Sequence, residues 1–262
     1  MKIAVCIKQV PDTTEVRLDP KTNTLIRDGV PSIINPDDKA ALEAALRIKD
    51  GAGASVTAIC MGPPQADVAL REALAMGCDN AILLSAREFG GSDTYATATI
   101  LAAALKKGDY DLIIAGRQAI DGDTAQVGPQ VAERLGIPQI SYAEEIRAEA
   151  DGVVVKRQYE DCYHLIEAKF PCLVTVLAEA VQPRHMTVRG TVEAYAADIP
   201  VLGFEDLKDG LNPDWIGLKG SPTNVVKSFA KQLKGQGIRL AGLSEDEAVN
   251  TIVQKLDELC II

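Results

Sequence analysis

The chain has 262 residues, and its apolar share of 47% is typical of a folded protein with a substantial core. Its net charge of −10 disfavours nonspecific binding to nucleic acid or anionic membranes, because like charges would meet. The sequence contains no run of about 18 apolar residues that could span a bilayer and no secretory signal. We therefore expect a cytoplasmic protein that binds neither nucleic acid nor membrane.

The cysteines and histidines indicate little catalytic chemistry. The six cysteines form no C-x-x-C pair, and four lie in apolar stretches such as IAVCIK and DELCII, so we expect buried, reduced thiols. The only histidines, His164 and His185, lie near no cluster with metal-ligand spacing. Neither a metal site nor histidine-based catalysis is expected.

Strand-like and helix-like segments alternate through the first half. The predicted strands are 2–8, 54–60, 80–85 and 111–116, and the predicted helices between them are 37–50, 65–77 and 93–107. The strands are apolar throughout rather than alternating, which is typical of a parallel sheet covered by helices on both faces. The sequence therefore predicts an α/β fold with a doubly wound, mostly parallel, Rossmann-like sheet.

Three segments interrupt or extend this pattern. Residues 15–29 read as a β-hairpin insertion, and the consecutive strands after about residue 138 suggest an antiparallel extension of the same sheet. Beyond the core, Pro and Gly recur until a final amphipathic helix that starts with the capping box Ser244-x-x-Glu247. We expect a core domain over residues 1–195 and an extended arm with a helix over residues 196–262.

Two loops near the chain start have residues suited to a ligand, since ligands bind at the carboxyl ends of strands in open α/β sheets. The first follows Cys6 in the first strand. In the second, Asn35 is a suitable N-cap and Pro36 a suitable first helical residue, followed by Asp37 and Asp38. Simple helix capping explains this second loop equally well.

The third loop, GRQAIDGDTAQVGPQ, follows the strand DLIIA and spans residues 116–130. Gly116 allows a close turn, and a diphosphate would fit against the amide N–H groups of residues 124–128 at a helix N-terminus. Asp121 and Asp123 should then turn toward ribose hydroxyls, an adenine amine or their own backbone amides.

Two points about this loop stay open from the sequence. Pro129 either places the helix start near residues 125–128 or kinks the helix. The stretch DGDTAQ is also compatible with a plain Asx turn between a strand and a helix. The chain contains neither a Walker A motif nor a Rossmann glycine triplet, and it shows no self-contained catalytic constellation.

Five stretches together resemble the β subunit of electron transfer flavoproteins, in order and over nearly the whole chain. They are VCIKQVPD, INPDDKAALEAALRIKD, ICMGPPQADVALREALAMGCDNAILL, LIIAGRQAIDGDTAQVGPQVAERLG and FPCLVTVLAEAVQPRHMTVRG. The resemblance implies a nucleotide-binding α/β domain paired with a flavin-carrying α subunit, which the arm from about residue 198 would wrap. The nucleotide contacts that it implies are Cys6, Asn35, Pro36, Asp37, Asp38, Met61, Gly116, Ala119, Ile120, Asp121, Gly122, Asp123, Thr124, Ala125, Gln126, Val127, Gly128, Pro129 and Gln130.

The nucleotide itself divides the family. Classical members, which hold a structural AMP, resemble AIDDDxNQTGQ in the third loop, whereas AIDGDTAQVGP here looks like the electron-bifurcating members that hold FAD. Gly122 stands where the classical pattern has an acid. Loss of that carboxylate and its Cβ would lower charge repulsion and steric hindrance toward a second phosphate.

For a bifurcating member, the resemblance implies that FAD in this chain accepts hydride from NADH. One electron would then pass to ferredoxin and the other, through the α-subunit flavin, to an acyl-CoA dehydrogenase-like partner. The flavin supplies the chemistry, so the absence of an acid, base or nucleophile set is expected. Whether the chain alone counts as an enzyme stays open.

The family region that docks the dehydrogenase corresponds to residues 179–195. Arg184, His185, Met186 and Arg189 differ from the classical pattern there, and an exposed Met among basic residues suits an adaptable docking surface. An ordinary loop and helix cap is the alternative interpretation.

Two other functions compete with bifurcation. The first is a classical electron carrier in which this chain holds AMP for structure alone. The second is an adenine-nucleotide sensor of the universal-stress type, which would need a glycine-rich phosphate loop after the last core strand. The stretch LAEAVQPRHM offers no such loop.

Overall fold

The computed structural model describes residues 1–12, 31–223, 237, 239 and 241–262. The chain divides into two compact units, Met1–Val225 and Val226–Ile262. The hairpin predicted for residues 15–29 lies outside the described residues. No helix within the described ranges is long and apolar enough to cross a membrane.

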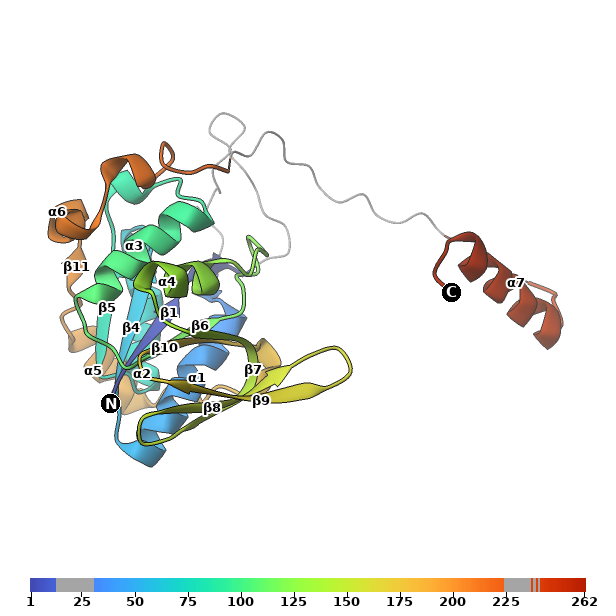
Figure 1. Cartoon of the computed structure of the whole chain (residues 1–262), viewed down its shortest axis with the longest axis horizontal. Coiled ribbons are helices and arrows are strands. Elements are labelled where there is room, and N and C mark those ends of the chain that lie inside the picture. The colour runs from blue at the N-terminus through green and yellow to red at the C-terminus, as the bar shows by residue number, and fades with distance from the viewer. Residues whose placement is uncertain (13–30, 224–236, 238, 240) are drawn as a thin grey trace. The chain divides into compact units, whose positions relative to one another are not determined.

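The first unit contains a large sheet with helices on both faces (Figure 1). The strands of this unit are β1 (Lys2–Ile7), β2 (Gln9–Pro11), β3 (Ser32–Ile34), β4 (Ser55–Met61), β5 (Asn80–Leu84), β6 (Leu112–Gly116), β7 (Gln139–Ala148), β8 (Gly152–Gln158), β9 (Tyr163–Lys169), β10 (Cys172–Val176) and β11 (Val201–Leu202). Of these, β2 and β3 form a separate two-stranded sheet. The α-helices of this unit are α1 (Pro36–Ala52), α2 (Asp67–Met76), α3 (Thr94–Lys106), α4 (Val127–Leu135), α5 (Val188–Ala196) and α6 (Phe204–Leu207). Apart from the hairpin of residues 15–29, every strand and helix predicted between residues 2 and 116 is present, with ends within two residues of the prediction.

The main sheet has nine strands in the order β11-β5-β4-β1-β6-β10-β7-β8-β9. Neighbours from β11 to β7 are parallel, and β8 and β9 are antiparallel. The chain runs from β1 outward to β4 and β5 and then crosses to β6 on the other side of β1. The point at which the strand order reverses therefore lies between β1 and β6. The predicted doubly wound sheet with an antiparallel extension is confirmed.

One strand differs from the prediction. The segment after residue 138 was expected to continue as antiparallel strands, but β10 returns into the sheet and lies parallel between β6 and β7. All five residues of β10 are buried, whereas β7 mixes exposed and buried residues and β9 has only exposed and partly buried ones. A strand that is apolar on both faces belongs in the covered, parallel part of a sheet.

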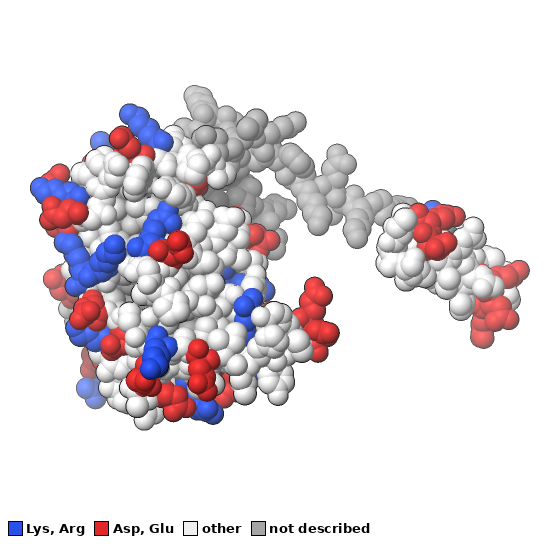
Figure 2. Space-filling view, viewed as in Figure 1, with Lys and Arg blue, Asp and Glu red and all other residues white. Residues whose placement is uncertain are grey.

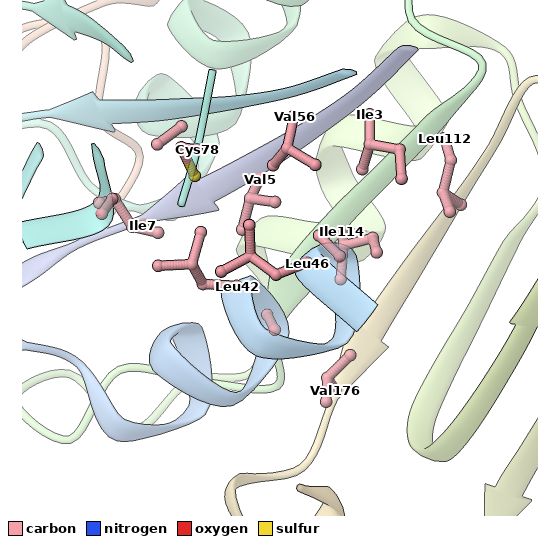
Figure 3. Close-up of a cluster of buried hydrophobic side chains, with 14 of the residues drawn as sticks. Ile3, Val5, Ile7, Leu42, Leu46, Val56, Cys78, Leu112, Ile114 and Val176 are labelled. Atoms are coloured by element: carbon pink, nitrogen blue, oxygen red, sulfur yellow. The ribbon is translucent and has the colours of Figure 1, made fainter. Parts of the chain in front are cut away.

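The core forms two layers because successive residues of β1 point to opposite faces. Ile3, Val5 and Ile7 join the cluster beneath α1 and α2, while Ala4 and Cys6 join the cluster beneath α3 and α4. Figure 3 shows side chains of the first cluster, with Leu46 of α1 lying toward the strand residues. Burial on both faces fixes the sheet and hence the positions of the loops at its carboxyl edge.

Residues 197–223, which follow α5, belong to the first unit. Leu207, Leu211 and Ile216 are buried and belong to the cluster on the α3 side, and β11 pairs with β5. The division between the two units follows Val225, not the residue 195 at which we placed the domain boundary. Contact of the second unit with a partner subunit stays a prediction.

The second unit contains α7 (Glu245–Glu258), which begins at the predicted capping box: Ser244 accepts from the Glu247 amide, and the Glu247 carboxylate accepts from the Ser244 amide. None of its residues is buried, and Val249 and Ile252 are more than half exposed. Cys260 follows this helix and is exposed, which corrects the prediction of a buried thiol.

The cysteines of the first unit divide in the same way. Cys6, Cys60, Cys78 and Cys172 are buried, and Cys162, in the turn between β8 and β9, is exposed. None of the six forms a disulfide. Figure 2 shows basic and acidic residues interspersed over the visible face of the first unit, so neither sign of charge dominates that face.

Candidate nucleotide site

A cleft of about 1230 Å³ lies at the carboxyl ends of β1, β4, β5 and β6. The loops that follow these strands form its walls, together with the N-terminal ends of α3 and α4. This is the position at which open α/β sheets bind ligands. The volume exceeds the roughly 300–1,000 Å³ of common small-molecule pockets, so a ligand as large as a dinucleotide can be accommodated.

The structure places about half of the predicted site residues in the wall of this cleft. Those that line it are Cys6, Asp38, Met61, Gly116, Ala119, Gly122, Thr124, Ala125, Gln126, Val127 and Gly128. The others are not among the residues that line it: Asn35, Pro36, Asp37, Ile120, Asp121, Asp123, Pro129 and Gln130. Their contact with a nucleotide stays a prediction.

Sequence reasoning missed the wall that follows β5. Ser85, Arg87 and Asp93 line the cleft there, and Asp93 caps α3 by accepting a hydrogen bond from the Ala96 amide. The available signal was the N-cap aspartate that opens the helix after the β5 strand. The loop at the end of β5 reaches the same edge of the sheet as the loops that we selected.

Asn35 holds the loop after β6. It stands at the N-cap position of α1, but its side chain makes no capping hydrogen bond, which corrects the capping interpretation. Its amide nitrogen donates to the Gln118 carbonyl at 2.7 Å, and its oxygen accepts from the Ile120 amide at 3.0 Å. Because Asn35 is fully buried, both of its polar atoms are committed to this loop.

Asp38 joins the two strands on either side of the switch point. Its carboxylate accepts from the Lys8 amide at 2.8 Å and from the Gly116 amide at 3.0 Å. Burial raises the pKa of Asp38 to about 7, although these hydrogen bonds act in the opposite direction. The neighbouring Asp37 is also buried and accepts from the Ala178 amide, which fixes the end of β10.

The N-terminus of α4 is free to receive an anion. The helix begins at Val127 with Pro129 in its first turn, which confirms the first of the two alternatives for this proline. It has no side-chain cap and no acidic residue in its first turn. Uncapped amide N–H groups and the helix dipole favour negative charge at such a position.

The two aspartates of the preceding loop have protein partners. Asp121 accepts from the Lys8 ammonium, and Asp123 accepts from the Gln118 side-chain amide. The loop directs its carboxylates toward other side chains. Contact of either aspartate with a ribose hydroxyl or an adenine amine stays a prediction.

The Cys6 thiol in the wall of the cleft is not activated for reaction. Burial, with smaller contributions from Asp38 and Cys60, raises the pKa of Cys6 to about 12, so this thiol stays protonated and is a poor nucleophile. Among the described residues, no group of three or more His, Cys, Asp or Glu side chains could hold a metal ion.

The predicted docking residues separate into two kinds. The Arg184 guanidinium is bound to Glu43, with Nε at 2.7 Å from one carboxylate oxygen, and also to Asp50 at 2.8 Å. It therefore ties the segment before α5 to α1. His185 and Met186 are exposed, and Arg189 pairs only with Glu193, one helical turn away. Their role in docking stays a prediction.

Replacing Arg184 with methionine should destabilise the protein by about 2 kcal/mol, because the buried Glu43 carboxylate would lose its main partner. Arg189→Met is the matched control, because it removes the same charge from an exposed ion pair that contributes little to the free energy of unfolding. Urea unfolding of both variants measures the difference. Equal losses would show that Arg184 does not act through Glu43.

The topology defines the chain as an α/β protein with a Rossmann-like sheet. Residues 22–201 match the model of the electron transfer flavoprotein domain. Similar proteins include the caffeyl-CoA reductase-Etf complex subunit CarD of Acetobacterium woodii, 53% identical over the full length of both chains. The electron transfer flavoprotein subunit beta of Clostridium acetobutylicum is 53% identical over 98% of each chain, and the acryloyl-CoA reductase electron transfer subunit gamma of Anaerotignum propionicum is 51% identical over the full length of both.

The chain belongs to the electron transfer flavoprotein family, among its β subunits. The match covers more than half of the chain, and the identities extend over its whole length. The resemblance seen in the sequence is thereby confirmed.

Proposed function

We propose that this chain is the FAD-binding β subunit of a cytoplasmic, electron-bifurcating complex with a flavin-carrying α subunit. When bound in the cleft, FAD would accept hydride from NADH and pass electrons to ferredoxin and, through the α-subunit flavin, to an acyl-CoA dehydrogenase-type partner. The observation that carries the proposal is the large cleft at the switch point, with the open position of Gly122 in its wall.

Gly122 is not required by the fold. Its backbone does not have a positive φ, and a Cβ placed on it would meet no atom of the described residues within 4 Å. By contrast, a Cβ on Gly128 would lie 2.5 Å from Thr175, so packing alone explains that glycine. The open space beside Gly122 supports a ligand that occupies this part of the cleft.

The donors of the cleft suit an anionic nucleotide. The uncapped start of α4 would bind phosphate oxygens through the amides of Val127 and Gly128, both of which line the cleft. Arg87 supplies a positive charge in the opposite wall. Asn35 and Asp38 orient the loops, and the neutral Cys6 thiol lies at the end of β1.

The relatives favour a reductase-linked complex. Two of them are named as subunits of complexes with caffeyl-CoA reductase and acryloyl-CoA reductase. By analogy, an acyl-CoA reductase or dehydrogenase is the partner class we propose here, with Met186 and the exposed residues of α5 as the docking surface. The relative named simply as a β subunit is equally compatible with a classical carrier.

The nucleotide content of the chain co-expressed with its α subunit tests the proposal. We expect about two FAD per heterodimer and no AMP after acid release and chromatography. Gly122→Asp should lose the FAD of this chain, because the added carboxylate would enter the open space beside the cleft, while Gly122→Ala should retain it. One FAD with one AMP would make this chain a structural subunit, and full FAD occupancy in Gly122→Asp would refute the role given to Gly122.

A further inference from the structure

The loop after β6, residues 117–126, is fastened to the first strand by an ion pair across the switch point. The Lys8 ammonium lies 2.6 and 2.8 Å from the two carboxylate oxygens of Asp121. The Asp121 side chain is only 8% exposed, whereas that of Lys8 is 41% exposed and lines the cleft. The pair therefore lies at the wall, with its cation on the side of the ligand.

The charge of this loop is a problem for an anionic ligand. Beyond Arg117, its charged residues are Asp121 and Asp123, directly ahead of the α4 N-terminus that would receive phosphate oxygens. Uncompensated carboxylates there would repel a diphosphate, and the repulsion is strong where solvent is partly excluded. Lys8 cancels the charge of the more buried of the two.

Asn35 fixes the same loop without any charge. Its two hydrogen bonds, to the Gln118 carbonyl and from the Ile120 amide, hold the backbone on the N-terminal side of Asp121. The loop position is therefore determined even when the ion pair is absent. Lys8 is consequently separable from the fold: its contribution is the compensation of charge rather than the placement of the backbone.

We propose that Lys8 is a positioning residue which neutralises Asp121 and so makes the loop after β6 compatible with a phosphate-bearing nucleotide. The inference rests on the proposed function only in that the ligand is a nucleotide, either FAD or AMP. Lys8 acts through Asp121. It follows that Lys8 becomes dispensable when Asp121 carries no charge.

Four variants of the complex with the α subunit test this dependence. Lys8→Gln leaves Asp121 uncompensated, Asp121→Asn removes the carboxylate, and the double variant removes both charges. Lys39→Gln is the matched control, since Lys39 forms a pair of the same 2.6 Å length with Glu72 on the surface between α1 and α2, outside the lining of the cleft. FAD is titrated into each dialysed complex, and binding beyond the single α-subunit flavin is measured by filtration and acid release.

Lys8→Gln should weaken FAD binding about tenfold, and the double variant should recover most of the loss. Lys39→Gln should bind FAD as tightly as the unmodified complex. Asp121→Asn should bind it more tightly, because a negative charge near the phosphates is removed. If the double variant binds as weakly as Lys8→Gln, Lys8 contacts the ligand directly and the inference is overturned. Unchanged binding in Lys8→Gln would overturn it as well.

The test also separates this inference from the proposed function. If chromatography finds AMP in place of FAD, the proposed function fails. The same four variants titrated with AMP would still show or refute the dependence of Lys8 on Asp121, because AMP also carries a phosphate. If Lys8→Gln binds both FAD and AMP more weakly and the double variant recovers both affinities, the inference about Lys8 is supported, whether or not the proposed function holds.

Discussion

Gly116→Ala is expected to destabilise the protein by about 3 kcal/mol or to prevent its accumulation. The added Cβ would lie 2.3 Å from the Asp38 Oδ1 atom and 2.6 Å from the Asp38 amide nitrogen. Neither contact is tolerable, and both atoms belong to a buried residue at the start of α1. The substitution would push α1 away from β6 and break the hydrogen bond from the Gly116 amide to Asp38.

Gly122→Ala is the control for this prediction, because it makes the same chemical change six residues later, in the loop that follows β6. Its Cβ would meet no atom in the part of the chain that the structure describes, and the backbone does not need a positive φ. The variant should be as stable as the unmodified protein or more stable by up to about 0.5 kcal/mol, through the lower entropy of its unfolded chain. Urea unfolding decides, and equal stabilities of Gly116→Ala and Gly122→Ala would contradict the packing argument.

The sequence predicted the sheet well because its strands are buried on both faces. Short apolar runs such as KIAVCI and LIIAG are typical of strands in a sheet that helices cover on both faces. Polar residues follow each run and mark the carboxyl edge of the sheet. The parallel position of β10 was missed although CLVTV is a run of the same kind, because we grouped it with β8 and β9, which directly precede it in the sequence. Strand order depends on which neighbours can cover both faces, and that information lies in the packing of whole helices rather than in a local pattern.

The candidate site was predicted in its location more than in its contacts. The sequence placed the loops after β1 and β6 and the start of α1 together, and they do meet at one cleft. The sequence did not show that Asn35 would form hydrogen bonds with the loop after β6. Nor did it show that Asp121 would form an ion pair with Lys8, which is more than a hundred residues away in the chain. An N-cap asparagine and an asparagine that serves a distant backbone have the same local signature, so only the tertiary arrangement distinguishes them.

Stability should fall as the pH rises from about 4 to about 7, and Asp38→Asn should remove this part of the pH dependence. Burial raises the pKa of Asp38 from its ordinary value of 3.8 to about 7. Between these values the folded protein keeps a proton that the unfolded chain has released, so each pH unit costs up to about 1.4 kcal/mol. Urea unfolding of both proteins across this range measures the difference between their slopes.

The opposite outcome has a definite physical meaning, since two effects compete at Asp38. The amides of Lys8 and Gly116 donate to the carboxylate and favour its ionised form, whereas burial disfavours it. Asp79 provides the contrast: its burial is outweighed by hydrogen bonds from the Lys49 ammonium and the Val56 amide, so its pKa is lowered. Asp79→Asn should therefore remove stability that is lost only as the pH falls below about 4. If Asp38→Asn behaves like Asp79→Asn, the hydrogen bonds dominate at the switch point and Asp38 is ionised in the folded protein.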